Sequence, residues 1–294
     1  MNRTPLRYPG GKQKLTPFIQ EILDSNEISG NYVEPYAGGA GVALELLLNK
    51  KVKNIHLNDS DIRLYSFWHS VKNETERLCK RILSASLTIE EWKKHREVLR
   101  QPENHTLFEI GFSTFYMNRC NRSGVLKAGV IGGLDQTGNY KMDARFSRND
   151  LIRRIELIGI YSDSIFLSNL DAEAYINNYI PNLDEDSLVY FDPPYFNKAK
   201  DLYLNSYKPE DHLRLADSIQ NVERPWVLSY DNVPEIIELY SSRNYFTYDL
   251  QYSAARNYKG REVFVFSDYL KLPKSCGLKY IDKELIELIE LIDK

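Results

Sequence analysis

An acid and an aromatic ring follow a short apolar run in the second half of the chain. Residues 188–191 read Leu-Val-Tyr-Phe, and Asp192, Pro193, Pro194 and Tyr195 come directly after them. The apolar run predicts a buried strand, and the prolines end it because proline lacks a backbone donor and has a fixed φ. In open α/β sheets, ligands bind outside the carboxyl ends of the strands. The tetrapeptide is therefore a candidate active site, and the alternative is a plain strand end capped by Asp192.

A glycine-rich turn follows an earlier predicted strand at 32–34. The segment from Glu34 reads Glu-Pro-Tyr-Ala-Gly-Gly-Ala-Gly and leads into a predicted helix at 42–48. Its glycines let the backbone approach a ligand closely at a βα turn. Asp59 ends the next predicted strand, 18 residues past Gly41, where an acid commonly binds ribose hydroxyls. The spacing matches neither Gly-x-Gly-x-x-Gly nor a P-loop, which favours a ligand with a ribose but no pyrophosphate, such as S-adenosylmethionine.

Composition predicts an ordinary globular protein in the cytoplasm. The chain has 294 residues, of which 43% are hydrophobic, and a formal net charge of −3. No stretch approaches the roughly 18 consecutive apolar residues of a membrane span, and the polar N-terminus does not resemble a signal peptide. The three cysteines, Cys79, Cys120 and Cys276, are scattered, so we expect free thiols and neither a disulfide framework nor a metal site.

Positive charge is concentrated in one stretch in spite of the net charge. Between Arg119 and Arg154 there are 8 basic and 3 acidic residues, a local charge of 8 − 3 = +5. The stretch also contains several glycine-rich turns, which predict an exposed loop or hairpin. A solvated face is the usual meaning of such a charge run, and a surface that binds nucleic acid is the other.

The order of the predicted elements indicates a single α/β domain with an insertion. Strands at 32–34, 54–57, 164–167, 188–191 and 226–229 alternate with helices, and two further strands at 246–250 and 262–266 are expected to pair as an antiparallel hairpin. Residues 61–119 read mainly as helices, including one that a Thr88 capping box opens. This pattern predicts a Rossmann-like sheet interrupted by a mainly helical insertion.

Four motifs occur along the chain in one order. They are Pro9-Gly10-Gly11-Lys12, the 34–41 turn, Asn58-Asp59 and the 192–195 tetrapeptide. In these motifs, and in the insertion between the third and the fourth, the chain resembles the Dam-type (class alpha) DNA adenine-N6 methyltransferases of the D12 class over most of residues 1–270. The resemblance implies a Rossmann-like S-adenosylmethionine-dependent methyltransferase. Its domains would be a catalytic part at 1–60 and 150–272, a target-recognition insertion at 61–149 and a C-terminal helix at 273–294.

The resemblance also implies how the tetrapeptide acts. The Asp192 carboxylate and the Pro193 carbonyl would accept the two N6 hydrogens of an adenine that has been flipped out of the duplex, and Tyr195 would stack on that base. Tyr8 and Lys12 resemble an N-terminal motif that closes over cofactor and target. Besides these two residues and Asp192, the expected cofactor ligands are Glu34, Tyr36, Gly38, Gly39, Gly41, Asp59 and Asp171.

In the insertion, the resemblance favours DNA contact over a solvated face. Residues 115–119 resemble the start of the family's recognition region, and the expected DNA-binding residues are Arg119, Asn121, Arg122, Lys127, Lys141, Arg145 and Arg148. The Asn-Gly-Leu-x-Arg hairpin of members that read GATC is replaced by Cys-Asn-Arg-Ser-Gly at 120–124, so GATC is not assigned as the target.

The expected partners are double-stranded DNA and a cognate restriction enzyme, with the protein acting as a monomer or dimer. Two alternatives remain: a methyltransferase that acts on RNA or another amino group, and a non-catalytic DNA-binding relative. Asp192 argues for adenine, since the resemblance associates Asn-Pro-Pro-Tyr with protein amides and Ser-Pro-Pro with cytosine. Binding alone would not require both Asp192 and Tyr195.

Overall fold

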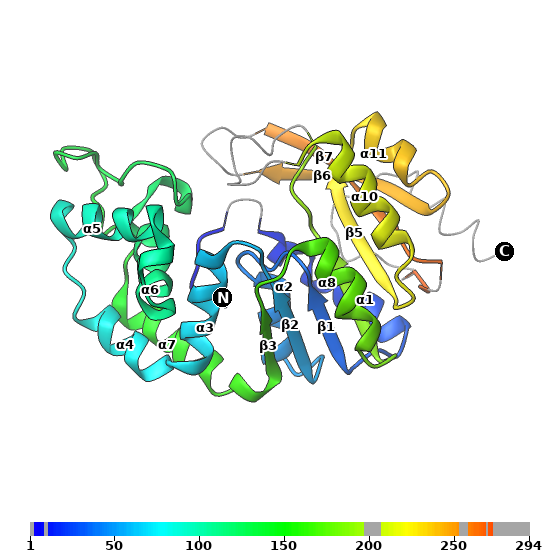
Figure 1. Cartoon of the computed structure of the whole chain (residues 1–294), viewed down its shortest axis with the longest axis horizontal. Helices are drawn as coiled ribbons and strands as arrows, with labels where there is room; N and C mark the ends of the chain where they lie inside the picture. The colour runs from blue at the N-terminus through cyan, green and yellow to red at the C-terminus, as the bar shows by residue number, and fades with distance from the viewer. Residues whose placement is uncertain (1–2, 9–10, 197–206, 253–257, 269, 273–294) are drawn as a thin grey trace.

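A single seven-stranded sheet forms the centre of the protein. In the computed structural model, which describes residues 3–8, 11–196, 207–252, 258–268 and 270–272, the strand order is β3-β2-β1-β4-β5-β7-β6 (Figure 1). Strands β1 to β5 are parallel, and β7 is antiparallel to both β5 and β6. The expected hairpin and Rossmann-like sheet are confirmed. The strands are β1 (Asn31–Glu34), β2 (Asn54–Asn58), β3 (Ile165–Ser168), β4 (Ser187–Phe191), β5 (Trp226–Asp231), β6 (Asn244–Tyr252) and β7 (Tyr258–Phe266).

Helices cover both faces of the sheet because successive strand residues point to opposite sides. On one face, Tyr32, Tyr190 and Phe264 pack in a core with α1 (Thr16–Ser25) and α2 (Gly41–Leu48). On the other, their neighbours Val33, Val189 and Val263 pack with the helices α8 (Ala172–Asn178), α10 (Pro209–Gln220) and α11 (Pro234–Leu239). The sheet is therefore apolar on both sides, and its polar groups are concentrated at the strand ends.

A second group of helices lies beside β3 (Figure 1). It consists of α3 (Ile62–Asn73), α4 (Thr75–Leu83), α5 (Ile89–Arg100), α6 (Leu107–Cys120) and α7 (Arg148–Gly159). Helix α6 is buried on nearly all sides and begins with a reciprocal capping box between Thr106 and Glu109. The boundary expected after residue 149 falls inside α7, which packs against α4 and α3.

Residues 121–147, hereafter the 121–147 segment, connect α6 to α7 without a regular strand. A short 3₁₀ turn, η3 (Arg122–Gly124), and one antiparallel bridge between Asn121 and Val130 are its ordered features. The other short 3₁₀ turns are η1 (Lys12–Leu15), η2 (Pro102–Asn104), η4 (Ser162–Ser164) and η5 (Ile180–Asn182).

Within the described residues, none of the helices is long and apolar enough to cross a membrane. The expected C-terminal helix at 273–294, Cys276, and Pro9 and Gly10 of the N-terminal motif lie outside the described residues.

Candidate active site

The predicted motifs meet where the order of the strands reverses. From β1 the chain proceeds to β2 and β3 on one side, whereas β4 and β5 lie on the other. The glycine turn follows β1, Asp59 follows β2 and Asp192 follows β4. Because these strands are parallel, all three motifs lie at their shared carboxyl edge, which is where open α/β sheets bind ligands.

Four side chains from distant parts of the sequence form a buried cluster at this edge, hereafter the Lys12 cluster. The Lys12 ammonium lies 2.6 Å from Glu262 Oε2 and 3.2 Å from Asp192 Oδ1. It also donates to the Tyr195 hydroxyl at 3.0 Å, and that hydroxyl donates to Glu262 Oε1 at 2.5 Å. Lys12 and Glu262 are buried, whereas the Asp192 side chain keeps 25% exposure. The cluster thus has one carboxylate that a substrate can reach and one that it cannot.

The end of β5 fixes the tetrapeptide. The Ser229 hydroxyl donates to Asp192 Oδ1 at 3.1 Å, and Asp231 accepts the Phe196 backbone N–H at 2.9 Å. Burial, with a smaller contribution from the nearby Glu262 carboxylate, raises the pKa of Asp192 to about 6, although Lys12 and the Ser229 hydroxyl oppose that shift. At neutral pH, Asp192 is therefore ionised and can accept hydrogen bonds.

The glycine turn adopts backbone angles that need small residues. Gly38 has φ +47°, and Tyr8 packs so closely that a Cβ on Gly38 would lie 2.8 Å from its ring. The Gly38 N–H donates to Asp59 Oδ2 at 3.0 Å, and the buried Trp68 indole donates to the Gly38 carbonyl at 3.0 Å. The other Asp59 oxygen accepts the Asp61 N–H at 2.9 Å. Asp59 thus braces the turn, and the Tyr8 ring packs against Gly38 and Gly39.

Two more carboxyls at this edge have raised pKa values. Burial raises the pKa of Glu34 to about 8 and that of Asp59 to about 7. Glu34 also accepts the Ala43 N–H of α2 at 3.3 Å. A cationic ligand would stabilise the charged form of each carboxyl, because an opposite charge nearby offsets desolvation.

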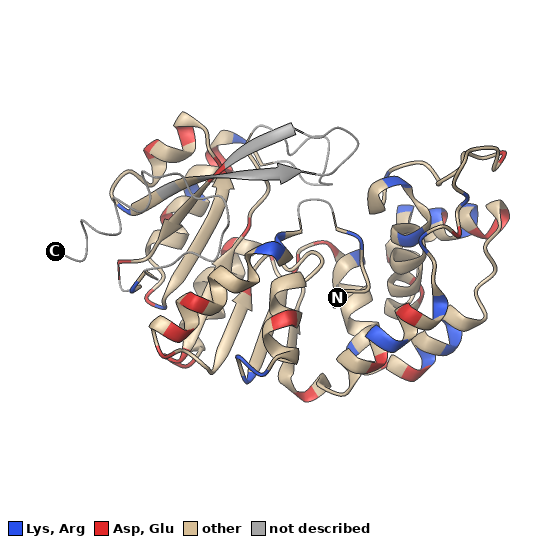
Figure 2. Ribbon diagram, turned by 180° about the vertical axis from the view of Figure 1, so that it is seen from behind, with Lys and Arg blue, Asp and Glu red and all other residues tan. Residues whose placement is uncertain are grey.

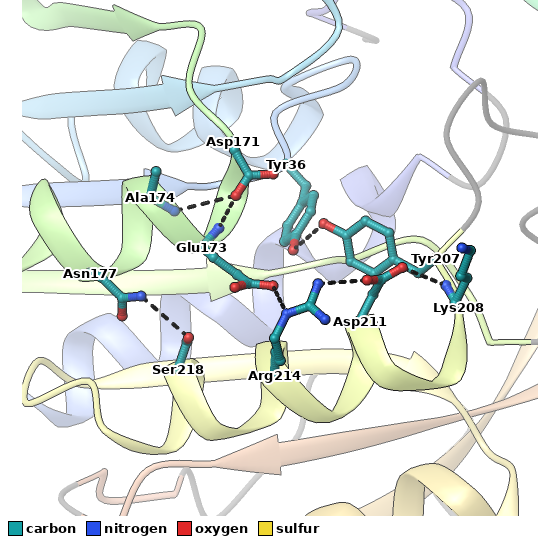
Figure 3. Close-up of polar contacts among 10 residues, drawn as sticks. All are labelled: Tyr36, Asp171, Glu173, Ala174, Asn177, Tyr207, Lys208, Asp211, Arg214 and Ser218. Atoms are coloured by element: carbon teal, nitrogen blue, oxygen red, sulfur yellow. Dashed lines mark hydrogen bonds and ion pairs between the residues drawn. The ribbon is translucent and has the colours of Figure 1, made fainter.

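Tyr36 and Asp171 lie on the side of α8 and α10 (Figure 3). The Tyr36 hydroxyl pairs with that of Tyr207 at 3.2 Å, and Asp171 caps α8 by accepting the N–H groups of Glu173 and Ala174. Burial raises the pKa of Tyr207 to about 12, and the Asp171 and Glu173 carboxylates contribute to that shift. Asp171 is exposed and thus reachable.

Beside this pair, Arg214 of α10 links Glu173 of α8 to Asp211 at 3.3 Å and 2.6 Å. The contact with Glu173 joins α10 to α8 next to Tyr207, whereas the contact with Asp211 lies within α10 (Figure 3).

Many basic residues lie on the helical group and the 121–147 segment, interspersed with acidic ones, as the blue and red positions of the ribbon show (Figure 2). Of the expected DNA-binding residues, four are exposed: Arg122, Lys127, Lys141 and Arg145. Arg119 is half-buried and donates to the carbonyls of Arg145 and Pro5, and Arg148 donates to the Ala85 carbonyl.

Asn121 does not match its expected role as a surface residue that reads DNA bases. It is fully buried, accepts the Trp92 indole N–H at 2.7 Å and donates to the carbonyls of Val125 and Leu126. Because both the oxygen and the nitrogen of its amide are hydrogen-bonded inside the protein, Asn121 stabilises the backbone of the 121–147 segment.

The neighbouring Asn118 joins this region to the N-terminal motif. Its amide accepts the Arg7 N–H at 2.8 Å and donates to the carbonyls of Arg7 and Gly124, each at 2.9 Å. The Arg7 guanidinium in turn donates to the Asn121 carbonyl at 3.1 Å. Arg7 directly precedes Tyr8, so continuous contacts run from the 121–147 segment to the glycine turn.

Sequence reasoning missed several members of the site, above all Glu262. The only indication of Glu262 in the sequence is that it is an acid at the start of the apolar run 262–266. Ser229, at the end of a predicted strand, gave a similar but weaker one. The described residues contain no cluster of three or more His, Cys, Asp or Glu side chains that could hold a metal ion.

The sheet and its glycine turn define a Rossmann-like methyltransferase, and comparison with known proteins gives the family. Residues 8–254 match the family described as D12 class N6 adenine-specific DNA methyltransferase. This match spans most of the chain, which therefore belongs to that family. It is an enzyme that methylates adenine in DNA.

Three curated relatives bear the name Type II methyltransferase. M.MjaIII of Methanocaldococcus jannaschii is 26% identical over 74% of this chain and 80% of its own length. M.CviBI of Paramecium bursaria Chlorella virus NC1A is 21% identical over 84% of this chain and 90% of its own length. M1.LlaDCHI of Lactococcus lactis subsp. cremoris is 25% identical over 81% of this chain and 84% of its own length. A solved rRNA methyltransferase from Streptomyces viridochromogenes covers 88% of this chain and 86% of its own at 11% identity, with a TM-score of 0.40.

Proposed function

We propose that this enzyme uses the Lys12 cluster and the glycine turn to transfer a methyl group from S-adenosylmethionine to N6 of a flipped adenine in double-stranded DNA, in the Dam-type (class alpha) manner. The observation that carries the proposal is that Asp192 is ionised and accessible to substrate. It lies at the sheet edge where the strand order reverses, and Lys12 and Ser229 hold its carboxylate. We extend the family resemblance to the subclass because the motifs follow its order.

The chemistry of the acids at the sheet edge fits S-adenosylmethionine. The ligand carries a sulfonium and an ammonium group, and Glu34 and Asp59, whose pKa values burial raises, offer the opposite charge. Gly38, Gly39 and Gly41 would admit its methionine end, Asp59 its ribose, and Asp171 its adenine amine. Tyr8 and Tyr36 would flank it from either side of the turn.

Asp192 and Pro193 supply what the adenine amine lacks. When bound, the cofactor supplies an activated methyl group. The N6 lone pair is delocalised into the ring, so hydrogen bonds from N6 to Asp192 and to the Pro193 carbonyl draw the nitrogen toward tetrahedral geometry. Held in this way, N6 could accept the methyl group that S-adenosylmethionine would supply, leaving S-adenosylhomocysteine, and the methylated nitrogen would release its extra proton to solvent. Pro194 stiffens the turn, and Tyr195 stacks on the flipped base.

We further propose that residues 61–149 form the target-recognition part. Arg122, Lys127, Lys141 and Arg145 are exposed and would contact phosphates or base edges, while Arg119 and Arg148 support them through backbone hydrogen bonds. The relatives' names lead us to propose that the protein works in a restriction–modification system, as a monomer or dimer beside a cognate restriction enzyme.

One experiment tests activity and target together. The protein is incubated with labelled S-adenosylmethionine and unmethylated genomic DNA, and modified bases are mapped by single-molecule sequencing. We expect N6-methyladenine in one sequence context. Transfer to cytosine, or transfer to RNA with none to DNA, would contradict the proposal.

A further inference from the structure

Glu262 is a buried acid that the proposed transfer does not use. It is 1% exposed and lies on β7, opposite Asp231 of β5 in the antiparallel register. Burying a carboxylate is costly unless it is paired and hydrogen-bonded. Glu262 meets that condition through Lys12 and Tyr195. This pairing suggests that the function of Glu262 is to position these two side chains.

The two oxygens of Glu262 have different partners. Oε2 contacts the Lys12 ammonium, which lies on η1 near the start of the chain, and Oε1 accepts the Tyr195 hydroxyl from the loop after β4. One carboxylate thus fixes a cation and an aromatic ring relative to each other. The Lys12 ammonium lies 5.3 Å from the centre of that ring and also contacts Asp192.

We propose that Glu262 is a positioning residue for methyl transfer, which holds the Tyr195 ring at its stacking angle and divides the charge of Lys12 between itself and Asp192. The inference rests on the proposed roles of Asp192 and Tyr195. Without Glu262, the Lys12 ammonium would lose one of its two carboxylate contacts, and the Tyr195 hydroxyl would lose the acceptor of its hydrogen bond.

If Glu262 shares the charge of Lys12 with Asp192, its loss should change the pKa of Asp192, which a residue with a purely packing role would not do. The groups that act on Asp192 are Lys12, Glu262 and the Ser229 hydroxyl. Other titratable groups that interact with it are Tyr32, Glu34, Tyr190 and Tyr230. Among them Glu262 raises the pKa of Asp192 and Lys12 lowers it. Neutralising Glu262 removes the first effect and strengthens the second, so the pKa of Asp192 must fall. If Asp192 works as a carboxylate, the acid limb of the rate profile moves to lower pH.

The test compares Glu262→Gln with the wild type in single-turnover transfer of labelled methyl groups to unmethylated genomic DNA between pH 5 and 9. We expect the maximal rate to fall about 100-fold through misplacement of the ring, and the acid limb to shift down by about one pH unit. Glu262→Asp keeps the charge and should return the limb toward the wild-type position. Glu235→Gln, at an exposed glutamate of α11, is the matched control and should change neither quantity.

An unshifted acid limb in folded Glu262→Gln would overturn the proposal, since a purely structural residue lowers the rate without moving the limb. Cofactor binding and thermal unfolding establish that the variant is folded. Should it not fold, Tyr195→Phe takes its place because it removes the anchoring hydroxyl and keeps the ion pair. For Tyr195→Phe we expect a slower methyl-transfer rate and an acid limb at the wild-type pH. An unchanged rate would overturn the proposal.

The same data separate the two proposals. A wild-type enzyme that transfers no methyl group to DNA contradicts the proposed function. Wild-type transfer combined with a Glu262→Gln profile like that of the wild type contradicts only the role of Glu262.

Discussion

The Lys12 cluster and the 121–147 segment are stabilised in contrasting ways. In the cluster, charged side chains from different elements contact one another, and two of the three, Lys12 and Glu262, are shielded from solvent. In the 121–147 segment, the buried amide of Asn121, together with that of Asn118 in α6, holds the backbone, while four cations remain exposed. Substitutions in the cluster should therefore change the chemistry, and substitutions in the segment should change stability or DNA affinity.

The largest effect is expected for Asp192→Ala. If Asp192 accepts an N6 hydrogen as proposed, its loss should reduce the methyl-transfer rate by about 100- to 1,000-fold or more. Cofactor binding should survive at least in part because the glycine turn is untouched. Single-turnover transfer and calorimetric cofactor titration measure the two quantities. Asp217→Ala, at an exposed acid of α10, serves as the control, and a normal rate in Asp192→Ala would remove Asp192 from the reaction.

Asn118→Ala should cause the next largest change. It leaves the N–H and C=O groups of Arg7 and the Gly124 carbonyl without their amide partner, at a cost of about 1–3 kcal/mol in the free energy of unfolding. Urea denaturation measures this cost. Asn104→Ala, at an exposed position, should stay within about 0.5 kcal/mol of the wild type, and equal stabilities for the two variants would show that the amide contacts stabilise nothing.

Lys127→Ala should act on DNA affinity alone. If the ammonium contacts a phosphate, its loss weakens binding similarly for all sequences and reduces the slope of log affinity against log salt by about 1. Fluorescence anisotropy with duplex DNA at several salt concentrations provides the slope. Lys53→Ala, just before the amino end of β2, lies at the edge opposite the site and should leave the slope unchanged; the same slope in both variants would place DNA elsewhere.

The smallest effect is expected for Ser229→Ala. The Ser229 hydroxyl stabilises ionised Asp192 and so lowers its pKa. Its loss raises that pKa above about 6, and the rate, which requires the carboxylate, is then lost at a slightly higher pH as the solution is acidified. The acid limb should thus move opposite to its shift in Glu262→Gln. A shift in the same direction would contradict the electrostatic account of the cluster.

Motif order and hydrophobic periodicity were enough to predict the sheet and the edge that carries the site. Asp192 and Asp59 can be identified from the local sequence, because each is an acid at the point where an apolar run ends. Glu262 gives no comparable signal, because its meaning depends on Lys12, which is 250 residues away. Asn121 shows the converse error: its type and its basic neighbours suggested a DNA contact, but Trp92 from another helix covers it.

The contact of Gly124 with Arg7 limits how this enzyme could change its target. Gly124 has φ +77°, and a Cβ there would lie 2.1 Å from the Arg7 carbonyl oxygen. A 121–147 segment transplanted from a relative would therefore need glycine at this position, and Asn118 ahead of it, to fit the N-terminal motif of the host. If the segment selects the target as proposed, exchange of specificity by recombination is restricted to donors that share this junction.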